Sequence, residues 1–241
     1  MLRFYFIIIV SIFAIFYFYL SFYIMEKHPD KFSEQQRYEL AQFACRTVQR
    51  NGRIKDTVYG LENLPEEGGY LMYSNHQGRY DALGIFIAHK KPCSFVVDKE
   101  RSKVTILNQI TILTDAKRLD KNDIKNQVTV IQEVADEVAH GRKILIFPEG
   151  GYGPHVTDNE VHEFMPGSFK AALKAKRPIV PIALVDSYKV FEKHSLRKVY
   201  TETHFLKAIP YEEFKDMNTI ELSQEVRRRI EDKIKEVLAN R

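Results

Sequence analysis

Short apolar runs alternate with helical patterns along this 241-residue chain from Thr57 onward. The apolar runs, which suit buried strands, lie at residues 71–73, 94–97, 110–113, 144–147 and 179–185. Apolar residues at helical spacing lie between them, at residues 82–88, 104–109, 124–140 and 168–175. Strands that alternate with helices usually pair in parallel and are covered on both faces, so the sequence predicts an α/β fold with a mainly parallel central sheet flanked by helices. Residues 199–208 alternate as an edge strand does.

The stretch at residues 4–25 carries no charged side chain and is mostly apolar. A helix of this length would extend about 33 Å, which is enough to cross the hydrocarbon core of a bilayer. No small-residue cleavage site follows it, so we expect an uncleaved membrane helix over residues 1–25. Its many aromatic side chains leave a second possibility, a helix that lies in the membrane interface. Only Arg3 precedes the stretch and many basic residues follow it, so the positive-inside rule predicts a cell-membrane protein with its C-terminal bulk in the cytoplasm.

A second helix is expected within residues 26–56, between the apolar stretch and the alternating pattern. Ser33 and Gln36 have the spacing of a capping box, and Asn51 followed by Gly52 provides a stop. The chain therefore divides into an anchor at residues 1–25, an amphipathic helix with a linker at residues 26–56, and a domain at residues 57–241.

Charge and cysteine content limit the classes of partner. The net charge of +4 suits an anionic membrane surface or a phosphate ligand, and it is not the pattern of a nucleic-acid-binding protein. Cys45 and Cys93 form no close pair, and the spacing of His155 and His162 matches no common ligand set, so we expect neither a disulfide framework nor a metal site. The remaining histidines, His89 among them, are expected at the surface or at helix ends.

His76 follows an apolar run at residues 70–73 and precedes Asp81 by five positions. A strand that ends before His76 and a helix that starts near Asp81 would let the loop fold the carboxylate onto the imidazole. Such a carboxylate fixes the tautomer and stabilises the imidazolium, which leaves the other ring nitrogen to act as a general base. Taken alone, the pair also suits a loop histidine beside a helix N-cap aspartate, and the pattern leaves both interpretations open.

A second apolar run, at residues 143–147, ends in Pro148, Glu149 and Gly150. Open α/β sheets build their sites at the carboxyl ends of strands. Since polar residues follow both runs at that end, His76, Asp81 and Glu149 are candidates for one site.

In combination these motifs resemble the glycerolipid acyltransferase family. Residues 75–81 read Asn-His-x4-Asp, residues 147–150 read Phe-Pro-Glu-Gly and residues 180–182 read Val-Pro-Ile, in the family's order. The resemblance implies an acyltransferase of phospholipid biosynthesis that esterifies the free hydroxyl of a membrane lysophospholipid, most simply lysophosphatidic acid. It implies acyl-CoA or acyl carrier protein as the donor, no cofactor, and a catalytic domain on the cytoplasmic side.

The resemblance also assigns roles to single residues. His76 would deprotonate the acceptor hydroxyl, which attacks the acyl thioester directly without an acyl-enzyme. Asp81 would orient His76. Glu149 and Gly150 would help to hold the glycerol-phosphate portion of the acceptor.

The phosphate contacts are where the sequence departs from the family. The family's middle motif ends in a phosphate-binding arginine, and Arg118, with Lys117 beside it, is the counterpart by resemblance. After Phe-Pro-Glu-Gly the family commonly has Thr or Ser and then Arg, whereas Gly151 and Tyr152 follow here. Arg79 could supply the missing charge, or it could be a solvated loop arginine.

Three other functions remain open at this stage. The first is the same acyl transfer to another lysolipid, and the second is a non-catalytic lipid-binding protein on the same fold. The third is a hydrolase that uses His76 as a base toward water. A serine hydrolase and an NTPase are disfavoured, because the chain has neither a G-x-S-x-G motif nor a P-loop.

Overall fold

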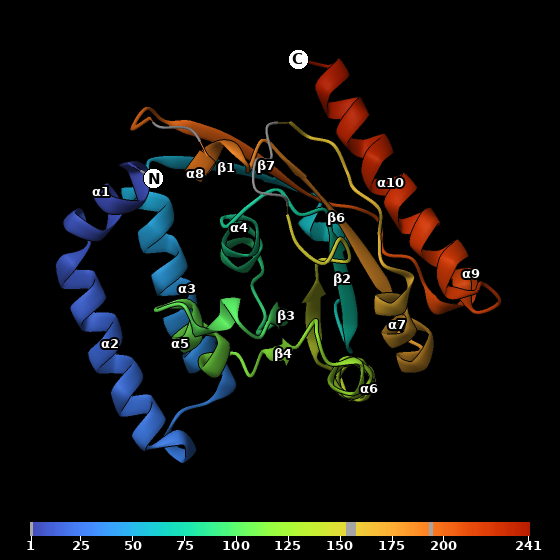
Figure 1. Ribbon diagram of the computed structural model, residues 1–241, viewed down its shortest axis with the longest axis horizontal. Coiled ribbons are helices and arrows are strands. Elements are labelled where there is room, and N and C mark those ends of the chain that lie inside the picture. The colour runs from blue at the N-terminus through green and yellow to red at the C-terminus, as the bar shows by residue number, and fades with distance from the viewer. Residues whose placement is uncertain (1, 153–157, 193–194) are drawn as a thin grey trace.

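The computed structural model describes residues 2–152, 158–192 and 195–241, and over these residues it contains one seven-stranded sheet between two layers of helices (Figure 1). The strands are β1 (Ile54–Tyr59), β2 (Tyr70–Ser74), β3 (Ser94–Asp98), β4 (Lys117–Leu119), β5 (Lys143–Ile146), β6 (Ile179–Val185) and β7 (Val199–Phe205). Their order is β1-β7-β6-β2-β5-β3-β4. Strands β6, β2, β5, β3 and β4 are mutually parallel, while β7 runs antiparallel to β6 and pairs in parallel with β1. The predicted α/β class with a mainly parallel sheet is confirmed.

The helices lie on both faces of the sheet. They are α1 (Leu2–Val10), α2 (Ile12–Lys27), α3 (Glu34–Asn51), α4 (Asp81–Ala88), α5 (Leu107–Leu113), α6 (Ile124–Ala139), α7 (Lys170–Ala175), α8 (Lys189–Glu192), α9 (Tyr211–Phe214) and α10 (Thr219–Ala239). Figure 1 shows α6, α7 and α10 on one side of the sheet and α2 to α5 on the other.

Strand β2 shows why both faces are covered. Leu71 and Tyr73 point into the core beneath α6, α7 and α10, while Tyr70 and Met72 point into the core beneath α2 to α5. All four side chains are buried. A strand that is apolar on both sides is stable only when each face packs against other elements, so β2 is fixed in the middle of the sheet.

The N-terminal apolar stretch forms two helices where the sequence predicted one. In the described part of the chain no single helix has the length and apolarity to cross a bilayer; α1 and α2 meet that test only together, across a bend of 72°. The buried hydroxyl of Ser11 accepts a hydrogen bond from Asn51 at the bend, over 2.8 Å. Arg3 donates to the carbonyl oxygens of Gly52, Ser195 and Arg197, which holds α1 against the domain. The single spanning helix is therefore not confirmed.

Helix α3 begins as predicted, since Ser33 accepts from the backbone of Gln36 and the Gln36 side chain accepts from the backbone of Ser33. Its buried residues Tyr38 and Ala41 share the core of the sheet. Strand β1 begins at Ile54, three residues before the predicted domain start, so the sheet extends into the predicted linker.

Three features of the predicted elements were wrong. Residues 110–113 belong to helix α5 and not to a strand, and the helix predicted at residues 104–109 begins only at Leu107. Strand β7 is not at the edge, because β1 pairs along its outer side. Polar and apolar residues alternate along β7 because one face of the sheet is exposed there. Such alternation does not require the strand to lie at the edge of the sheet.

Candidate active site

His76 and Asp81 form a hydrogen-bonded pair at the carboxyl end of β2. The Nδ1 atom of His76 lies 2.7 Å from Oδ2 of Asp81. Asp81 is the first residue of α4 and is completely buried, whereas the His76 side chain is 15% exposed. The loop between β2 and α4 therefore places a carboxylate against one ring nitrogen and leaves the opposite edge of the ring near solvent.

Asp81 is held by three further donors. Its Oδ2 atom accepts from the backbone N–H groups of Gln77 and Gly78, over 2.5 and 2.8 Å. Its Oδ1 atom accepts from the hydroxyl of Ser187, which follows β6. Carboxylates that accept several hydrogen bonds are stabilised in the charged form and cannot rotate freely. Asp81 is thus suited to fix the position and tautomer of His76.

Glu149 comes to the same place from the neighbouring strand. Tyr73 of β2 pairs with Ile146 of β5, so the residues just past the two strand ends lie side by side. The Oε1 atom of Glu149 accepts from the backbone N–H of His76 over 2.9 Å. Its Oε2 atom is buried and has no hydrogen-bond partner among the described residues. Burial, partly offset by the backbone amide of His76, raises the pKa of Glu149 to about 7.

Gly150 makes the turn that aims Glu149. Its φ of +71° lies in the left-handed region, and its N–H donates to the carbonyl of Phe147 over 3.1 Å. A Cβ atom at this position would lie 2.6 Å from Cε of Met165. Conformation and space both favour glycine here.

Aromatic side chains enclose the imidazole. The ring of Phe147 stacks on His76 with centroids 4.2 Å apart, and the ring of Tyr152 meets it edge-on at 4.7 Å. Among the described residues, no hydrogen bond to the Nε2 atom of His76 is present, so a substrate hydroxyl can take that position. An imidazole with one nitrogen on a carboxylate and the other open is the arrangement of a general base.

The other predicted site residues do not touch this centre. Arg118 is exposed on β4 and donates to Asn108 over 2.8 Å. Lys117 points the other way and pairs with Glu133 and Glu137 of α6, over 3.2 and 2.6 Å. Opposite directions are expected for neighbours on a strand.

Arg79 is exposed in the loop before α4. It has no hydrogen bond or ion pair within the described parts of the chain. The predicted roles of Arg79, Arg118 and Lys117 stay predictions.

Three residues of the site were missed by the sequence reasoning. Ser187 contacts Asp81, Arg101 lies over the ring of Tyr152, and Lys121 lies beside Gly151. Each is far from its partner in sequence and belongs to no recognisable motif. In the sequence, each lies in a loop near the end of a predicted strand or the start of a predicted helix. Many other loop residues share that position, so it could not single these three out.

Metal ligation finds no support in the described residues, where no group of three His, Cys, Asp or Glu side chains could hold an ion. His155, weighed in the sequence as a possible ligand, lies outside the described residues.

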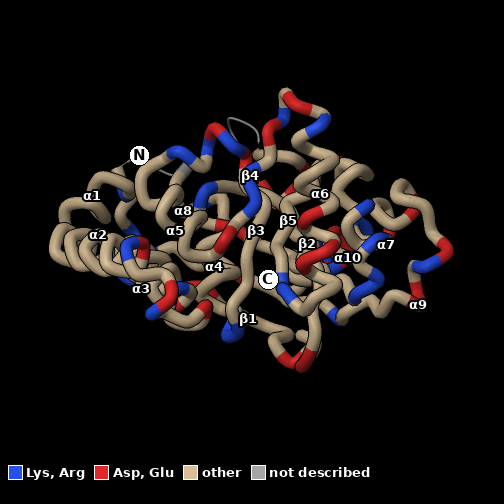
Figure 2. Tube along the Cα trace, turned by 90° about the horizontal axis from the view of Figure 1, so that it is seen from below, with Lys and Arg blue, Asp and Glu red and all other residues tan. Residues whose placement is uncertain are grey.

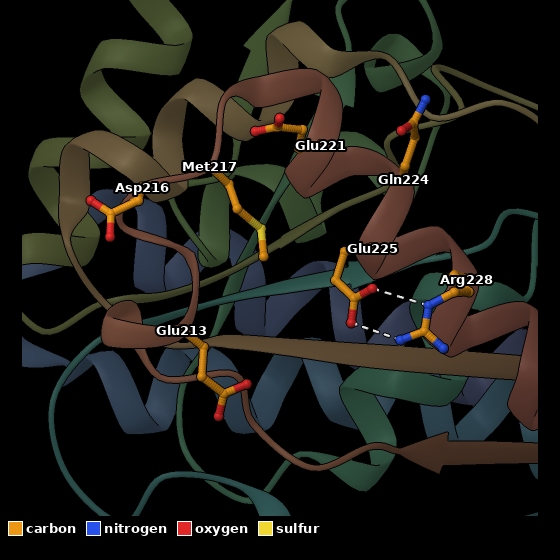
Figure 3. A pocket seen from close by; sticks show the side chains of 7 residues that line it. All are labelled: Glu213, Asp216, Met217, Glu221, Gln224, Glu225 and Arg228. Atoms are coloured by element: carbon orange, nitrogen blue, oxygen red, sulfur yellow. Dashed lines mark hydrogen bonds and ion pairs between the residues drawn. The ribbon is translucent and has the colours of Figure 1, made fainter.

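A shallow hollow lies beside α9 and α10 (Figure 3). It is lined by Glu213, Asp216, Met217, Glu221, Gln224, Glu225 and Arg228. Glu225 and Arg228, one turn apart on α10, form an ion pair in its lining. No residue of the predicted site lines this hollow.

Comparison with known proteins assigns the class. The family model described as Acyltransferase matches residues 55–185, which is more than half of the chain and includes both motifs of the site. The chain belongs to this acyltransferase family.

Curated relatives carry more specific names. The chain is 30% identical over 132 residues to a 1-acyl-sn-glycerol-3-phosphate acyltransferase of Chlamydomonas reinhardtii, covering 54% of this chain and 39% of the relative. It is 28% identical over 157 residues to a 1-acyl-sn-glycerol-3-phosphate acyltransferase of Borreliella burgdorferi, covering 63% and 61%. The matches thus span only about 40–60% of the length of these relatives.

A solved structure has the same fold. The crystal structure of the 1-acyl-sn-glycerophosphate (LPA) acyltransferase PlsC from Thermotoga maritima superposes with a TM-score of 0.74. The match covers 98% of this chain and 94% of that one, at 20% sequence identity. At this identity the likeness concerns the fold alone.

Proposed function

We propose that this protein transfers an acyl group from acyl-CoA or acyl carrier protein to the free hydroxyl of lysophosphatidic acid, giving phosphatidic acid for phospholipid biosynthesis. One observation carries the proposal most: the His76 imidazole is held by buried Asp81 on one nitrogen and is open on the other. The family membership and the names of the relatives support the same reaction.

The geometry suits direct transfer. The Nε2 atom of His76 accepts the proton of the acceptor hydroxyl as its oxygen attacks the thioester carbonyl. The imidazolium that forms is stabilised by Asp81, and it returns the proton to the leaving thiolate or to solvent. The thioester already carries a good leaving group, so no enzyme nucleophile is needed. The nearby hydroxyl of Ser187 is bonded to Asp81 and to Gln77, not to His76.

Glu149 is suited to hold the acceptor. Its buried Oε2 atom needs a hydrogen-bond partner, and such groups are costly to leave unsatisfied. With a pKa of about 7, the carboxyl group can accept a bond from a hydroxyl or, when protonated, donate one to an ester or phosphate oxygen. Gly150 holds it in this orientation.

For the location, we propose attachment to the cell membrane through α1 and α2, with the catalytic domain on the cytoplasmic side. Ile9, Phe13 and Phe16 are 71%, 87% and 70% exposed, and Figure 2 shows α1 and α2 as an end of the molecule largely without charged residues. The bend between the helices and the docking of Arg3 favour helices that lie in the interface over a single span. Residues 1–25 would then be the membrane-associating part and residues 26–56 would join it to the acyltransferase domain at residues 57–241.

The attachment is tested by replacing Phe13 and Phe16 together with serine, which keeps the packed residues of α2 intact. The double variant should fold normally and bind anionic vesicles several-fold more weakly than the parent in a flotation assay. A matched double substitution at the exposed Tyr200 and Val128, which lie on the sheet and α6, should leave binding unchanged. Equal flotation of all three proteins would refute the attachment.

The reaction is tested by incubating the full chain, in vesicles, with radiolabelled acyl-CoA and a panel of lysolipids. Labelled phosphatidic acid should form fastest with lysophosphatidic acid. Faster labelling of a lysolipid that lacks a phosphate monoester would show that lysophosphatidic acid is not the preferred acceptor. Labelled free fatty acid as the main product would show that the protein is a hydrolase and not a transferase.

A further inference from the structure

Tyr152 stands where the family commonly has Arg after Phe-Pro-Glu-Gly, and it links the imidazole to a cation. Its ring is perpendicular to that of His76, with centroids 4.7 Å apart. The guanidinium of Arg101 lies over the ring, 4.6 Å from its centroid. Guanidinium groups are attracted to the face of an aromatic ring, and the ring then limits where they can go. These two distances place the guanidinium carbon of Arg101 within about 10 Å of the centroid of the His76 ring.

Asp98, the last residue of β3, sets the position of Arg101 and of a second cation. Its Oδ1 atom accepts from the backbone N–H of Arg101 over 2.9 Å, and its Oδ2 atom lies 3.4 Å from Nζ of Lys121. A Cβ atom on Gly151 would lie 3.4 Å from the same Nζ. Two cations therefore border the turn that carries Glu149: Lys121 pairs with Asp98, and Arg101 lies over Tyr152.

The guanidinium of Arg101 is not neutralised. Its side chain is exposed, and within the described residues it pairs with no carboxylate, whereas its neighbours Lys99 and Lys103 pair with Asp120 and Glu100. An oriented, unpaired guanidinium has its donors free for an anion. Planar forks of N–H donors match the oxygens of a phosphate group.

We propose that Arg101, stacked on Tyr152 and supported by Lys121, binds the phosphate monoester of the acceptor lipid. This rests on the proposed acyl transfer, and it assigns the charge missing after Phe-Pro-Glu-Gly to a residue that follows β3. Arg118, on β4, donates to Asn108 of α5, and within the described residues no hydrogen bond or ion pair joins it to the Tyr152 turn. Arg101 then sets the preference for a phosphate monoester over a zwitterionic headgroup.

The test measures steady-state kinetics of the full chain in vesicles with acyl-CoA, varying acceptor and donor separately. Arg101→Ala should raise the KM for lysophosphatidic acid about ten- to a hundredfold and leave the donor KM within twofold. Arg101→Lys should fall between, since it keeps the charge without the planar stack. Tyr152→Phe should retain the acceptor KM because the ring face remains, while Tyr152→Leu should raise it.

Lys103→Ala is the matched control, since Lys103 lies on the same turn as Arg101 and pairs with Glu100. It should leave both KM values unchanged. A wild-type protein that acylates no lysolipid would refute the proposed reaction itself. If the wild type is active and Arg101→Ala leaves the acceptor KM unchanged, the assignment of Arg101 to the acceptor phosphate is overturned. It is also overturned if the donor KM rises instead, which would place the phosphates of CoA at Arg101.

Discussion

Two histidines that flank α4, one before it and one after it, show opposite arrangements of the same side chain. His89 ends α4 and is almost completely buried, with Nε2 2.6 Å from the hydroxyl of Tyr70 and Nδ1 2.6 Å from the carbonyl of Lys91. Burial lowers its pKa to about 4. His76 has one nitrogen on Asp81 and the other open. A histidine whose two nitrogens are both satisfied supports the fold, and one with a nitrogen to spare can move a proton.

The comparison is tested most strongly by replacing each histidine with alanine. His76→Ala should lower kcat for acyl transfer about 10²–10⁴-fold and leave the melting temperature nearly unchanged, because a partly exposed general base is lost. His89→Ala should lower the melting temperature and leave kcat nearly unchanged, because it leaves the Tyr70 hydroxyl and a carbonyl unpaired in the core. Specific activity of its folded fraction should stay near that of the parent. Near-normal acyl transfer by His76→Ala would contradict the role of His76 as general base.

Acid should destabilise the protein through His89. Its folded pKa of about 4 lies below the ordinary value of 6.5, so the unfolded chain takes up the proton first as the pH falls. The stability present above pH 6.5 should therefore be lost between pH 6.5 and 4, by about 2–3 kcal/mol at pH 4.5. Urea unfolding of the parent and His89→Gln over this range measures it. Parallel curves for the two proteins would show that His89 does not carry the loss.

Glu149 should act in the opposite direction. Its folded pKa of about 7 lies above the ordinary 4.5, so the stability present below pH 4.5 is lost as the pH rises through 7. Glu149→Gln cannot ionise, so it should gain about 2–3 kcal/mol relative to the parent between pH 5 and 8. The same urea titrations at higher pH provide the measurement. An unchanged difference would mean that the carboxyl group is ionised in the folded protein throughout.

The smallest expected effect belongs to Ser187, which we interpret as a positioning residue for Asp81. Ser187→Ala removes one of the donors to Asp81, so kcat should fall about fivefold, with no change in the acceptor KM. Ser187→Thr keeps the hydroxyl donor and should restore kcat. A loss that appears in the acceptor KM would point to substrate contact instead.

The catalytic pair could be predicted from the sequence because its parts are local. His76 and Asp81 lie on one short loop, and the parallel register of β2 and β5 brings Glu149 beside them. Ser187 and Arg101 could not be found in this way, because their partners come from other strands and no spacing connects them. Their contacts exist only once the whole sheet is assembled.

Contacts between distant parts of the chain, together with ambiguous local patterns, also explain the errors in the predicted fold. The bend between α1 and α2 lies at Ser11 within an apolar run, and it is fixed by Asn51 and by the docking of Arg3, which the local pattern does not contain. Residues 110–113 are a short apolar run, and such runs fit a buried strand and a helix equally well. Strand β1 was missed because its exposed face carries polar residues.

Direct transfer without an acyl-enzyme is tested most directly by following the label from radiolabelled acyl-CoA in rapidly quenched reactions of the wild-type protein. With lysophosphatidic acid present, the label should appear in phosphatidic acid at the rate at which CoA is released. Without acceptor, no label should be found on the protein and no burst of CoA should occur. Covalently labelled protein, or label that ends mainly in free fatty acid, would contradict a hydroxyl activated by His76 that attacks the thioester directly.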